Sequence, residues 1–322
     1  CLDCGICSEC YRCVWACERE AIDHNMQEQR EELEVGGIIL ATGFELYDGR
    51  KIPQYGYGRF ENVYSALEVE RLVNAGGPTG GEVLLKDGRK PEAVAILHCI
   101  GSRDRQHNAH CSRVCCMYSM KLAHLIREKT DAQVYEFYFD ITAFGKGSAE
   151  FYDRVQEEGI IFIRGKGAEV ERADKDRLLV RAGETLLGEI VEMPGDMVVL
   201  ATAMVPTADA DELAHQFHVT RGEDGFFWEP HPKLRPVETA MDGIFLAGAC
   251  QAPKDIPDTV AQASGAAAQL IGLLNRGRVE IEPMTAEVMP ARCVACGLCM
   301  EVCPSGAVEW AEHADQRWAE IN

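Results

Sequence analysis

Several features that define whole classes of protein are missing from this sequence of 322 residues. No run of about 18 apolar residues is present, so no transmembrane helix is predicted, and no signal peptide is visible. Basic residues are few, because 32 Lys and Arg stand against 52 Asp and Glu, for a net charge of −20. Nucleic acids and anionic membranes require basic surfaces, so this balance argues against both as partners. We expect a cytoplasmic protein whose partners are other protein subunits.

Two further absences concern the start of the chain and nucleotide binding. The sequence opens on Cys1, inside a cysteine motif and without a Met, so we expect functional residues upstream. The glycine fingerprint GxGxxG, which follows the first strand of a dinucleotide-binding fold, occurs nowhere before residue 36. We therefore expect any flavin site that depends on this fingerprint to be incomplete in this chain.

Cysteine is abundant and unevenly placed. Of 15 cysteines, six lie in the first 17 residues, four between Cys99 and Cys116, four between Cys293 and Cys303, and Cys250 stands alone. A secreted disulfide scaffold would be short and would distribute its cysteines along the whole chain. Tight clusters without a signal peptide predict metal binding instead.

The last cluster has the sequence CVACGLCMEVCP over residues 293–304. Gaps of two, two and three residues followed by Pro match the bacterial ferredoxin spacing. Zinc sites usually combine two separated pairs of ligands, which fits less well. The motif predicts a [4Fe-4S] cluster on four ligands: Cys293, Cys296, Cys299 and Cys303. In two-cluster ferredoxins the fourth cysteine serves the other cluster, so either this module holds one cluster or a second motif lies beyond Asn322.

The first cluster repeats this spacing without the trailing Pro. The simplest interpretation is one complete [4Fe-4S] cluster on Cys7, Cys10, Cys13 and Cys17. Cys1 and Cys4 would then belong to a further cluster completed by residues upstream. A shifted register, with Cys1, Cys4 and Cys7 on one cluster, is the alternative.

Between these modules, three apolar runs typical of buried strands each end in small residues: GGIILATG at 36–43, DMVVLAT at 196–202 and DGIFLAGA at 242–249. Small residues at the carboxyl end of a strand let the backbone approach a ligand. The last run precedes a long helix rich in small residues, and Pro257 and Asp258 suit its N-terminus. This order resembles the thioredoxin-reductase type of two-dinucleotide-fold flavoprotein, an α/β fold.

That resemblance implies roles for particular residues around FAD. Ala41, Thr42 and Gly43 would lie near the adenine or pyrophosphate half, and Gly248 and Ala249 beside the ribityl-pyrophosphate. The segment that approaches the isoalloxazine ring would contribute four residues: Lys254, Asp255, Ile256 and Asp258. A cation near the ring stabilises reduced, anionic flavin. Lys254 is the candidate, and an ordinary surface lysine is the alternative.

The middle cysteines follow another buried-strand pattern, AVAILHCIGS at 93–102. A second GxGxxG would follow this strand in a pyridine-nucleotide flavoprotein, but only Gly101 remains. Cys99, Cys111, Cys115 and Cys116 crowd the loop and the start of an amphipathic helix expected over 117–128. We predict a third, nonstandard cluster on these four thiols. The alternatives are buried structural cysteines, or ligation by His98, His107 or His110. For Cys250 we favour packing over metal binding.

Three stretches carry a closer resemblance: CSRVCCMYSMKLAHLIREK, EFYFDITAFGKGSAEFYDRVQEEGIIFIRGK and FLAGACQAPKDIPDTVAQASGAAA. All three are similar to the A-subunit family of heterodisulfide reductases, bacterial members included, and the similarity covers nearly the whole chain. It implies FAD, several [4Fe-4S] clusters and flavin-based electron bifurcation. It also implies that the four middle cysteines hold a cluster. Residues 134–167 should form strand, loop, helix and strand, in which four polar or aromatic residues are either functional or fold residues: Asp140, Phe144, Lys146 and Tyr152.

The predicted architecture is a thioredoxin-reductase-like two-dinucleotide-fold core with ferredoxin-like modules at both ends. The expected segments are 1–23 (ferredoxin-like), 24–90 (FAD domain), 91–195 (second dinucleotide fold with the middle cluster), 196–278 (FAD domain) and 285–322 (ferredoxin-like). The expected function is that of an oxidoreductase subunit that passes electrons between flavin and clusters. Implied partners are other complex subunits, hydrogenase- or dehydrogenase-type electron-input subunits, ferredoxin and a second copy of the chain.

Two other functions compete with this one. The first is a self-contained NAD(P)H-dependent flavoenzyme resembling the small subunit of glutamate synthase. It requires a nucleotide fingerprint at 97–104, which the sequence lacks. The second is a non-catalytic iron–sulfur scaffold or redox sensor, which would carry clusters without flavin.

Overall fold

A computed structural model describes most of the chain, in two compact units divided after Gly36. The described residues are 11–173, 177–279, 286–303, 306–313 and 316–321. Four predicted ligands therefore lie outside the described residues: Cys1, Cys4, Cys7 and Cys10. Among the residues it does describe, the structure contains no helix both long enough and apolar enough to cross a membrane.

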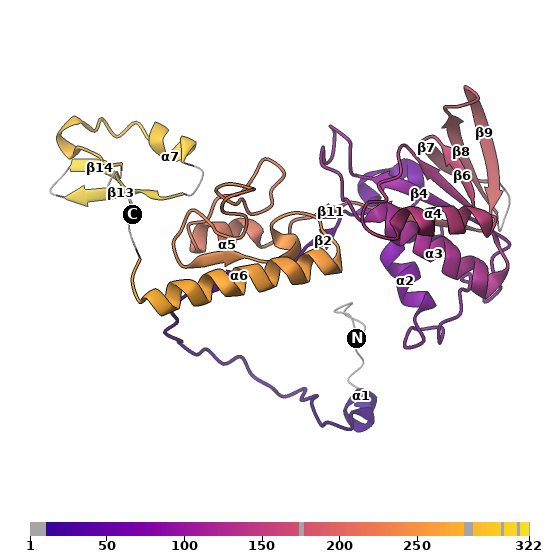
Figure 1. Cartoon of the computed structure of the whole chain (residues 1–322), viewed down its shortest axis with the longest axis horizontal. Helices are drawn as coiled ribbons and strands as arrows, with labels where there is room; N and C mark the ends of the chain where they lie inside the picture. Colours follow the sequence, from indigo (N-terminus) through magenta and orange to yellow (C-terminus); the bar gives the residue numbers. More distant parts are fainter. Residues whose placement is uncertain (1–10, 174–176, 280–285, 304–305, 314–315, 322) are drawn as a thin grey trace. The chain divides into compact units, whose positions relative to one another are not determined.

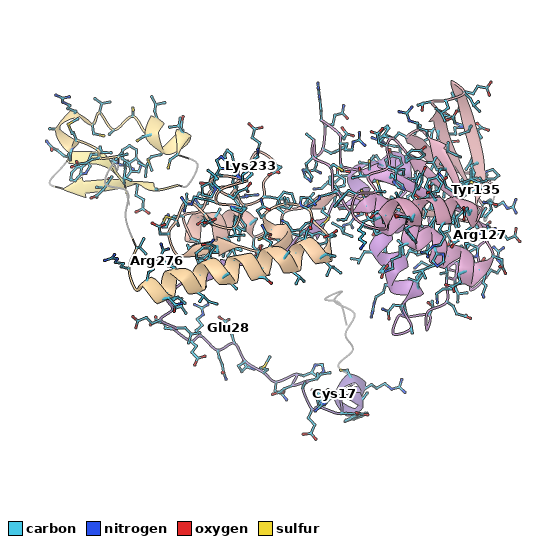
Figure 2. All side chains as sticks on the ribbon, viewed as in Figure 1. Cys17, Glu28, Arg127, Tyr135, Lys233 and Arg276 are labelled. Atoms are coloured by element: carbon cyan, nitrogen blue, oxygen red, sulfur yellow. The ribbon has the colours of Figure 1, made fainter. Side chains whose placement is uncertain are left out.

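In the first unit the described residues form one short helix, α1 (Arg12–Ala16), followed by an extended segment. The helix ends at Cys17, which Figure 2 labels beside it. None of its residues is buried. A helix of five residues has too few hydrogen bonds to be stable alone, so its stability must come from elsewhere, such as bound metal.

The second unit is built around a five-stranded parallel sheet (Figure 1). Its strands, in spatial order, are β3 (Val63–Ser65), β10 (Met197–Thr202), β4 (Ala93–Ile100), β5 (Gln133–Tyr138) and β6 (Ile161–Arg164). All of β10 and nearly all of β4 are buried, because both faces of the sheet are covered. The parallel order confirms the predicted α/β class. β3 and β10 fall in the predicted FAD-domain segments 24–90 and 196–278. In the structure they belong to the same sheet as β4, because β10 pairs with β4 on one side and with β3 on the other.

Helices cover one face of this sheet and an antiparallel meander covers the other (Figure 1). The helices are α2 (Ala66–Val73), α3 (Cys115–Thr130) and α4 (Ser148–Glu157). The meander strands are β7 (Gly167–Arg172), β8 (Leu178–Glu184) and β9 (Glu189–Gly195). The side chains of β4 alternate, so that Ile96 packs under the helices and Leu97 under the meander. The strand, loop, helix and strand predicted over 134–167 are confirmed as β5, α4 and β6.

A smaller set of elements surrounds the predicted flavin residues. Two parallel strands pair there, β1 (Ile38–Leu40) and β12 (Ile244–Leu246), with Leu40 opposite Leu246. The elements that complete this part of the chain are β2 (Glu45–Leu46), β11 (Met204–Val205), α5 (Ala210–Gln216), α6 (Ile256–Arg276) and the 3-10 turn Gly248–Cys250. Two other 3-10 turns, Gly49–Lys51 and Pro53–Tyr55, precede β3, and Tyr55 packs with the meander. α6 ends at Arg276, which Figure 2 labels. Its N-cap is Asp255, whose carboxylate accepts from the Asp258 N–H, so the predicted start is confirmed.

The last described elements follow the ferredoxin-type spacing. They are a 3-10 turn (Pro290–Arg292), α7 (Leu298–Val302) and the antiparallel hairpin of β13 (Val308–His313) and β14 (Gln316–Ile321). Cys303 is the C-cap of α7, as Cys17 is the C-cap of α1. The described parts of the two cysteine motifs therefore fold in the same local way.

Candidate functional site

The four middle cysteines come from two elements and the loop between them. Cys99 lies near the carboxyl end of β4, Cys115 and Cys116 open α3, and Cys111 lies in the intervening loop. Strand-to-helix connections place the end of the strand and the start of the helix at the same edge of a parallel sheet. Cys99, Cys115 and Cys116 are buried while Cys111 is exposed, and all four are free thiols. The structure thus places the predicted ligands at one edge of the sheet.

The backbone in this loop adopts conformations that side chains usually avoid. Cys99 has φ 58° and Arg113 has φ 62°, although neither is Gly. Left-handed backbone costs about 1–2 kcal/mol at a residue with a side chain. Such local strain clusters at functional sites, where the surrounding structure maintains it. At Cys99 it accompanies a shift in the pairing of β4 with β10, one residue before β4 ends at Ile100.

The thiols also act on one another electrostatically. A hydrogen bond between Cys115 and Cys116 lowers the pKa of Cys116 and raises that of Cys115. Burial raises the pKa of Cys99 to about 11, and the charges of Cys116 and Cys111 contribute to the shift. Crowded thiolates repel unless a cation lies among them, and bound iron supplies that charge.

Buried polar atoms without partners lie on or next to the two elements that carry three of these thiols. His98 Nδ1, Ser102 Oγ and Ser119 Oγ are all buried and make no hydrogen bond. Ser119 lies one turn after Cys115 on α3, and Ser102 follows the end of β4. Buried polar groups are normally satisfied, so donors left open beside thiols fit a group rich in sulfur acceptors. The donor set and its surroundings therefore fit an iron–sulfur cluster.

A single metal ion is a poorer match for this site. Within the described ranges, no three His, Cys, Asp or Glu side chains converge on a point where one ion would bind. A four-iron cube is wider than an ion, and each thiolate ligates a different corner, so its ligands lie farther apart than those of a single ion. The spread of the thiols over β4, the loop and α3 suits the larger group.

The three histidines considered as ligands differ in their partners. His107 Nδ1 lies 2.8 Å from the Tyr47 hydroxyl, and His110 Nε2 lies 2.9 Å from the Met204 carbonyl oxygen. His98 Nε2 lies 2.8 Å from Glu136 Oε2, and both side chains are fully buried. Burial alone would lower the pKa of His98, but its interactions with Cys116 and Glu136 raise it to about 9. Each histidine is thus already oriented by a neighbour.

Sequence reasoning missed two charged residues at this site. Glu136 occupies an inward position of β5, where an acid in an apolar strand was the available signal. Arg113 NH2 lies 2.5 Å from Asp258 Oδ2, which links the cysteine loop to the start of α6. No sequence spacing indicates this pair, because 145 positions separate its members.

Four residues were expected to be either functional or fold residues, and their surroundings in the structure differ. Asp140 pairs with Arg103 at 2.7 Å, and the Phe144 ring lies under the Arg113 guanidinium at 4.6 Å. Tyr152 packs edge-on against Phe162 with ring centroids 5.0 Å apart, as a fold residue does. Lys146 is exposed. Asp140 and Phe144 therefore border the cysteine loop and its arginines.

The predicted flavin residues meet where two parallel strands end. Ala41, Thr42 and Gly43 follow β1, and Gly248 and Ala249 follow β12. Gly43 has φ 79° with open space where a Cβ would lie, whereas Gly248, also at φ 79°, is buried and a Cβ there would lie 3.2 Å from Thr259. Small residues at adjacent strand ends let a dinucleotide approach the backbone, and here the Ala41–Gly43 side is the open one.

Lys254 and Cys250 are fixed behind these strand ends. Lys254 Nζ donates to the Gly248 carbonyl at 2.8 Å, to Gln251 Oε1 at 2.8 Å and to the Ala252 carbonyl at 3.0 Å. Burial lowers its pKa. Cys250 is buried, with its thiol 3.2 Å from the carbonyl oxygens of Leu40 and Ala247. Lys254 is therefore no ordinary surface lysine, and Cys250 packs as predicted.

The outer motifs present sulfurs that receive backbone hydrogen bonds. Ala21 N–H donates to Cys17 Sγ at 3.4 Å, and Ala319 N–H donates to Cys293 Sγ at 3.4 Å. These bonds lower the pKa of both thiols. N–H donors to ligand sulfurs are one of the means by which proteins set cluster potentials.

Known proteins resemble both the last cysteine motif and the chain as a whole. Residues 286–309 match the family described as "4Fe-4S binding domain". The chain is 51% identical over 300 residues to iron-sulfur A-subunit 2 of the CoB–CoM heterodisulfide reductase of Methanopyrus kandleri, covering 92% of this chain and 46% of that protein. It is 50% identical over 319 residues to the A-subunit of the H(2):CoB-CoM heterodisulfide,ferredoxin reductase of Methanothermobacter marburgensis, covering 98% and 48%.

A third relative and one solved structure complete the comparison. The chain is 42% identical to the iron-sulfur A-subunit of the CoB–CoM heterodisulfide reductase of Methanocaldococcus jannaschii, covering 100% of this chain and 49% of that protein. The chain thus spans about half the length of the curated relatives it matches. It also aligns with thioredoxin reductase of T. acidophilum at 13% identity and a TM-score of 0.49, over 75% of this chain and 66% of that one.

Proposed function

Because this chain belongs to the A-subunit family of heterodisulfide reductases, we propose that it transfers electrons between a bound flavin and iron–sulfur clusters. The observation that carries the proposal is the set of four thiols at the carboxyl edge of β4. In a dinucleotide fold that edge normally carries a glycine-rich phosphate grip. Here three buried thiols and one exposed thiol occupy it.

The cysteine sets provide the one-electron side of this function. Two sets have the ferredoxin spacing: Cys7, Cys10, Cys13 and Cys17, and Cys293, Cys296, Cys299 and Cys303. The third is Cys99, Cys111, Cys115 and Cys116, with Cys1 and Cys4 for a further cluster. Clusters would supply one-electron transfer, and FAD would supply exchange of electron pairs. Several separate routes for single electrons are also what flavin-based bifurcation requires, so we include it in the proposal.

The strand ends and the start of α6 provide the flavin side. Ala41, Thr42, Gly43, Gly248 and Ala249 would present backbone to FAD, with Asp255, Ile256 and Asp258 nearer its ring. Lys254 would act as the cation that stabilises negative charge on the reduced ring. Its three hydrogen bonds hold the ammonium group beside the β12 strand end. The Arg113–Asp258 ion pair joins this segment to the cysteine loop.

Partners follow from the family and from charge. Other subunits of a heterodisulfide-reductase-like complex, an electron-input subunit of hydrogenase or dehydrogenase type, and ferredoxin are the proposed partners. The names of two relatives mention ferredoxin and hydrogen as reactants of those proteins. A net charge of −20 favours protein partners with basic docking surfaces over nucleic acid.

The test is a spectrum of the full-length protein purified without oxygen, with iron and flavin quantified. Electron transfer through both cofactors predicts bound flavin together with cluster absorbance that bleaches when flavin is reduced. Clusters without flavin would favour the scaffold or sensor. Reduction by NAD(P)H alone would favour the self-contained flavoenzyme, although β4 ends without its fingerprint.

A further inference from the structure

A buried acid and a buried histidine lie beneath the middle cysteines, on the helix-covered face of the sheet. The side chains of β4 alternate, and Ile96 packs under the helices, so His98, two positions on, points the same way. On β5, Val134 packs under the helices, and Glu136 follows it by two positions. The parallel register sets Ile96 opposite Glu136, which brings Glu136 beside His98. α3, which carries Cys116, covers this face.

Stability alone does not explain this pair. His98 and Glu136 lie 2.8 Å apart with side chains 1% and 0% exposed. Removing two polar groups from water costs several kcal/mol, and well-packed apolar residues at such positions are often as stable or more so. Glu136 Oε1 and His98 Nδ1 are moreover left without partners. The pair therefore calls for a function that apolar residues cannot supply.

The unpartnered nitrogen of His98, Nδ1, indicates what this function is. Glu136 engages Nε2, and the buried, unpartnered Nδ1 lies on the sheet face that α3 covers, where the first turn of α3 carries Cys116. Cys116 is also one of the thiols assigned to the middle cluster. A histidine held at one nitrogen by a carboxylate is fixed in orientation, so that its other nitrogen is aimed at a defined atom.

We propose that His98 is a positioning residue for the middle cluster: a proton shared between Nε2 and Glu136 Oε2 leaves its Nδ1–H free to donate to the Cys116 sulfur. This inference rests on the proposed function, because it requires a cluster on the four middle thiols. A hydrogen bond to a ligand sulfur stabilises the reduced cluster more than the oxidised one, since reduction adds negative charge to the sulfurs. His98 therefore raises the potential of this cluster.

Two double variants isolate the donor. His98→Asn with Glu136→Leu keeps an amide N–H₂ close to the position of Nδ1, whereas His98→Leu with Glu136→Leu has the same size without a donor. Both lack the buried acid, so neither leaves an unpaired charge. The measurement is the midpoint potential of the middle cluster in the anaerobically purified chain, by redox titration followed by electron paramagnetic resonance. The signal absent from Cys116→Ser identifies this cluster.

If His98 donates to the cluster, the midpoint potential of the middle cluster should be more negative in the His98→Leu variant than in the His98→Asn variant. At a fixed potential the ratio of reduced to oxidised cluster should be about tenfold lower than in the His98→Asn variant, which is about 59 mV for one electron. The matched control is His124→Leu with Glu158→Leu, which removes a second histidine–acid pair, at 2.7 Å, from α3 and the end of α4. Its potential should equal that of the unsubstituted chain. Equal potentials in the two His98 variants, or an equal shift in the control, would overturn the assignment.

One measurement needs no variant at all. In the unsubstituted chain with ¹⁵N-labelled histidine, hyperfine spectroscopy of the reduced middle cluster should show a coupled histidine nitrogen, and its absence would overturn the proposal. Different results would contradict the role of His98 and the proposed function. Iron content that Cys116→Ser leaves unchanged would remove the middle cluster itself, and His98's role with it. Normal iron content with equal potentials would remove only the role of His98.

Discussion

Tyr11 and Gly297 hold the same left-handed backbone conformation at matching places in two cysteine motifs. Tyr11 has φ 58° and ψ 7°, and Gly297 has φ 78° and ψ −6°. Each precedes a five-residue helix, and in sequence each lies between the second and third cysteines of its motif. The turn between these cysteines therefore requires positive φ at both ends of the chain, although only one of them uses Gly.

Replacing Tyr11 should reveal this requirement. Because Gly tolerates positive φ and Ala does not, Tyr11→Gly should hold its cluster about 1 kcal/mol more tightly than Tyr11→Ala. Both variants lose the ring contact with His24, so the comparison isolates the backbone. Iron retained against a competing chelator should differ about fivefold. Gly297→Ala should weaken the other module similarly, and equal retention in the Tyr11 pair would contradict the shared turn.

Removing a middle thiol should cost one cluster. Cys115→Ser or Cys116→Ser should lower iron by about four atoms per chain, since a cubane with three thiolates is labile. Iron and sulfide analysis of the anaerobically purified variants provides the measurement. Cys250→Ser is the control, because its hydroxyl can donate to the same carbonyls of Leu40 and Ala247 and no cluster is assigned there. Unchanged iron in the first two variants would remove the middle cluster.

Removing the Lys254 ammonium should make the flavin harder to reduce. Lys254→Met keeps the length of the side chain but loses the charge, so the midpoint potential should become more negative. The three N–H groups are already donated to protein acceptors, so Lys254 acts through its charge; an interaction of about 1.4 kcal/mol corresponds to about 30 mV for two electrons. Lys233→Met, at an exposed position labelled in Figure 2, serves as the control and should leave the potential unchanged. An unchanged flavin potential in Lys254→Met would remove Lys254 from the site.

Gly101 should prove sensitive to a single added methyl group. It has φ 75°, and a Cβ there would overlap the Tyr47 ring. Gly101→Ala combines backbone strain with overpacking and should destabilise the fold by about 2–3 kcal/mol. Gly188→Ala, at φ 73° with open space around it, carries the strain alone and should cost about 1 kcal/mol. Thermal unfolding provides the comparison, and equal losses would mean that Tyr47 does not restrict the loop.

The sequence predicted the buried parallel strands well because each is apolar on both faces. β4 and β10 show this pattern, and a helix start near Pro257 and Asp258 was also evident. The meander of β7, β8 and β9 was not predicted. Its strands bury only one face, and charged residues such as Arg181 interrupt the apolar pattern. Such strands are defined by packing on the sheet more than by local sequence.

At the candidate site, spacing identified the thiols but not their surroundings. Four cysteines within 18 positions indicate metal without any knowledge of the fold. The His98–Glu136 pair depends on two strands being adjacent in one register, and the Arg113–Asp258 pair depends on a contact over 145 positions. Contacts of this kind arise from tertiary structure, so a single sequence carries no signal for them.

The central claim is that thiolate sulfur holds iron at separate places around a flavoprotein core. The most direct test is the iron, acid-labile sulfide and flavin content of the full-length protein prepared without oxygen. Three clusters predict at least about twelve iron atoms with matching sulfide, together with bound flavin and a brown colour that bleaches on reduction. Colourless protein, with zinc or bare thiols at these cysteines, would contradict the claim.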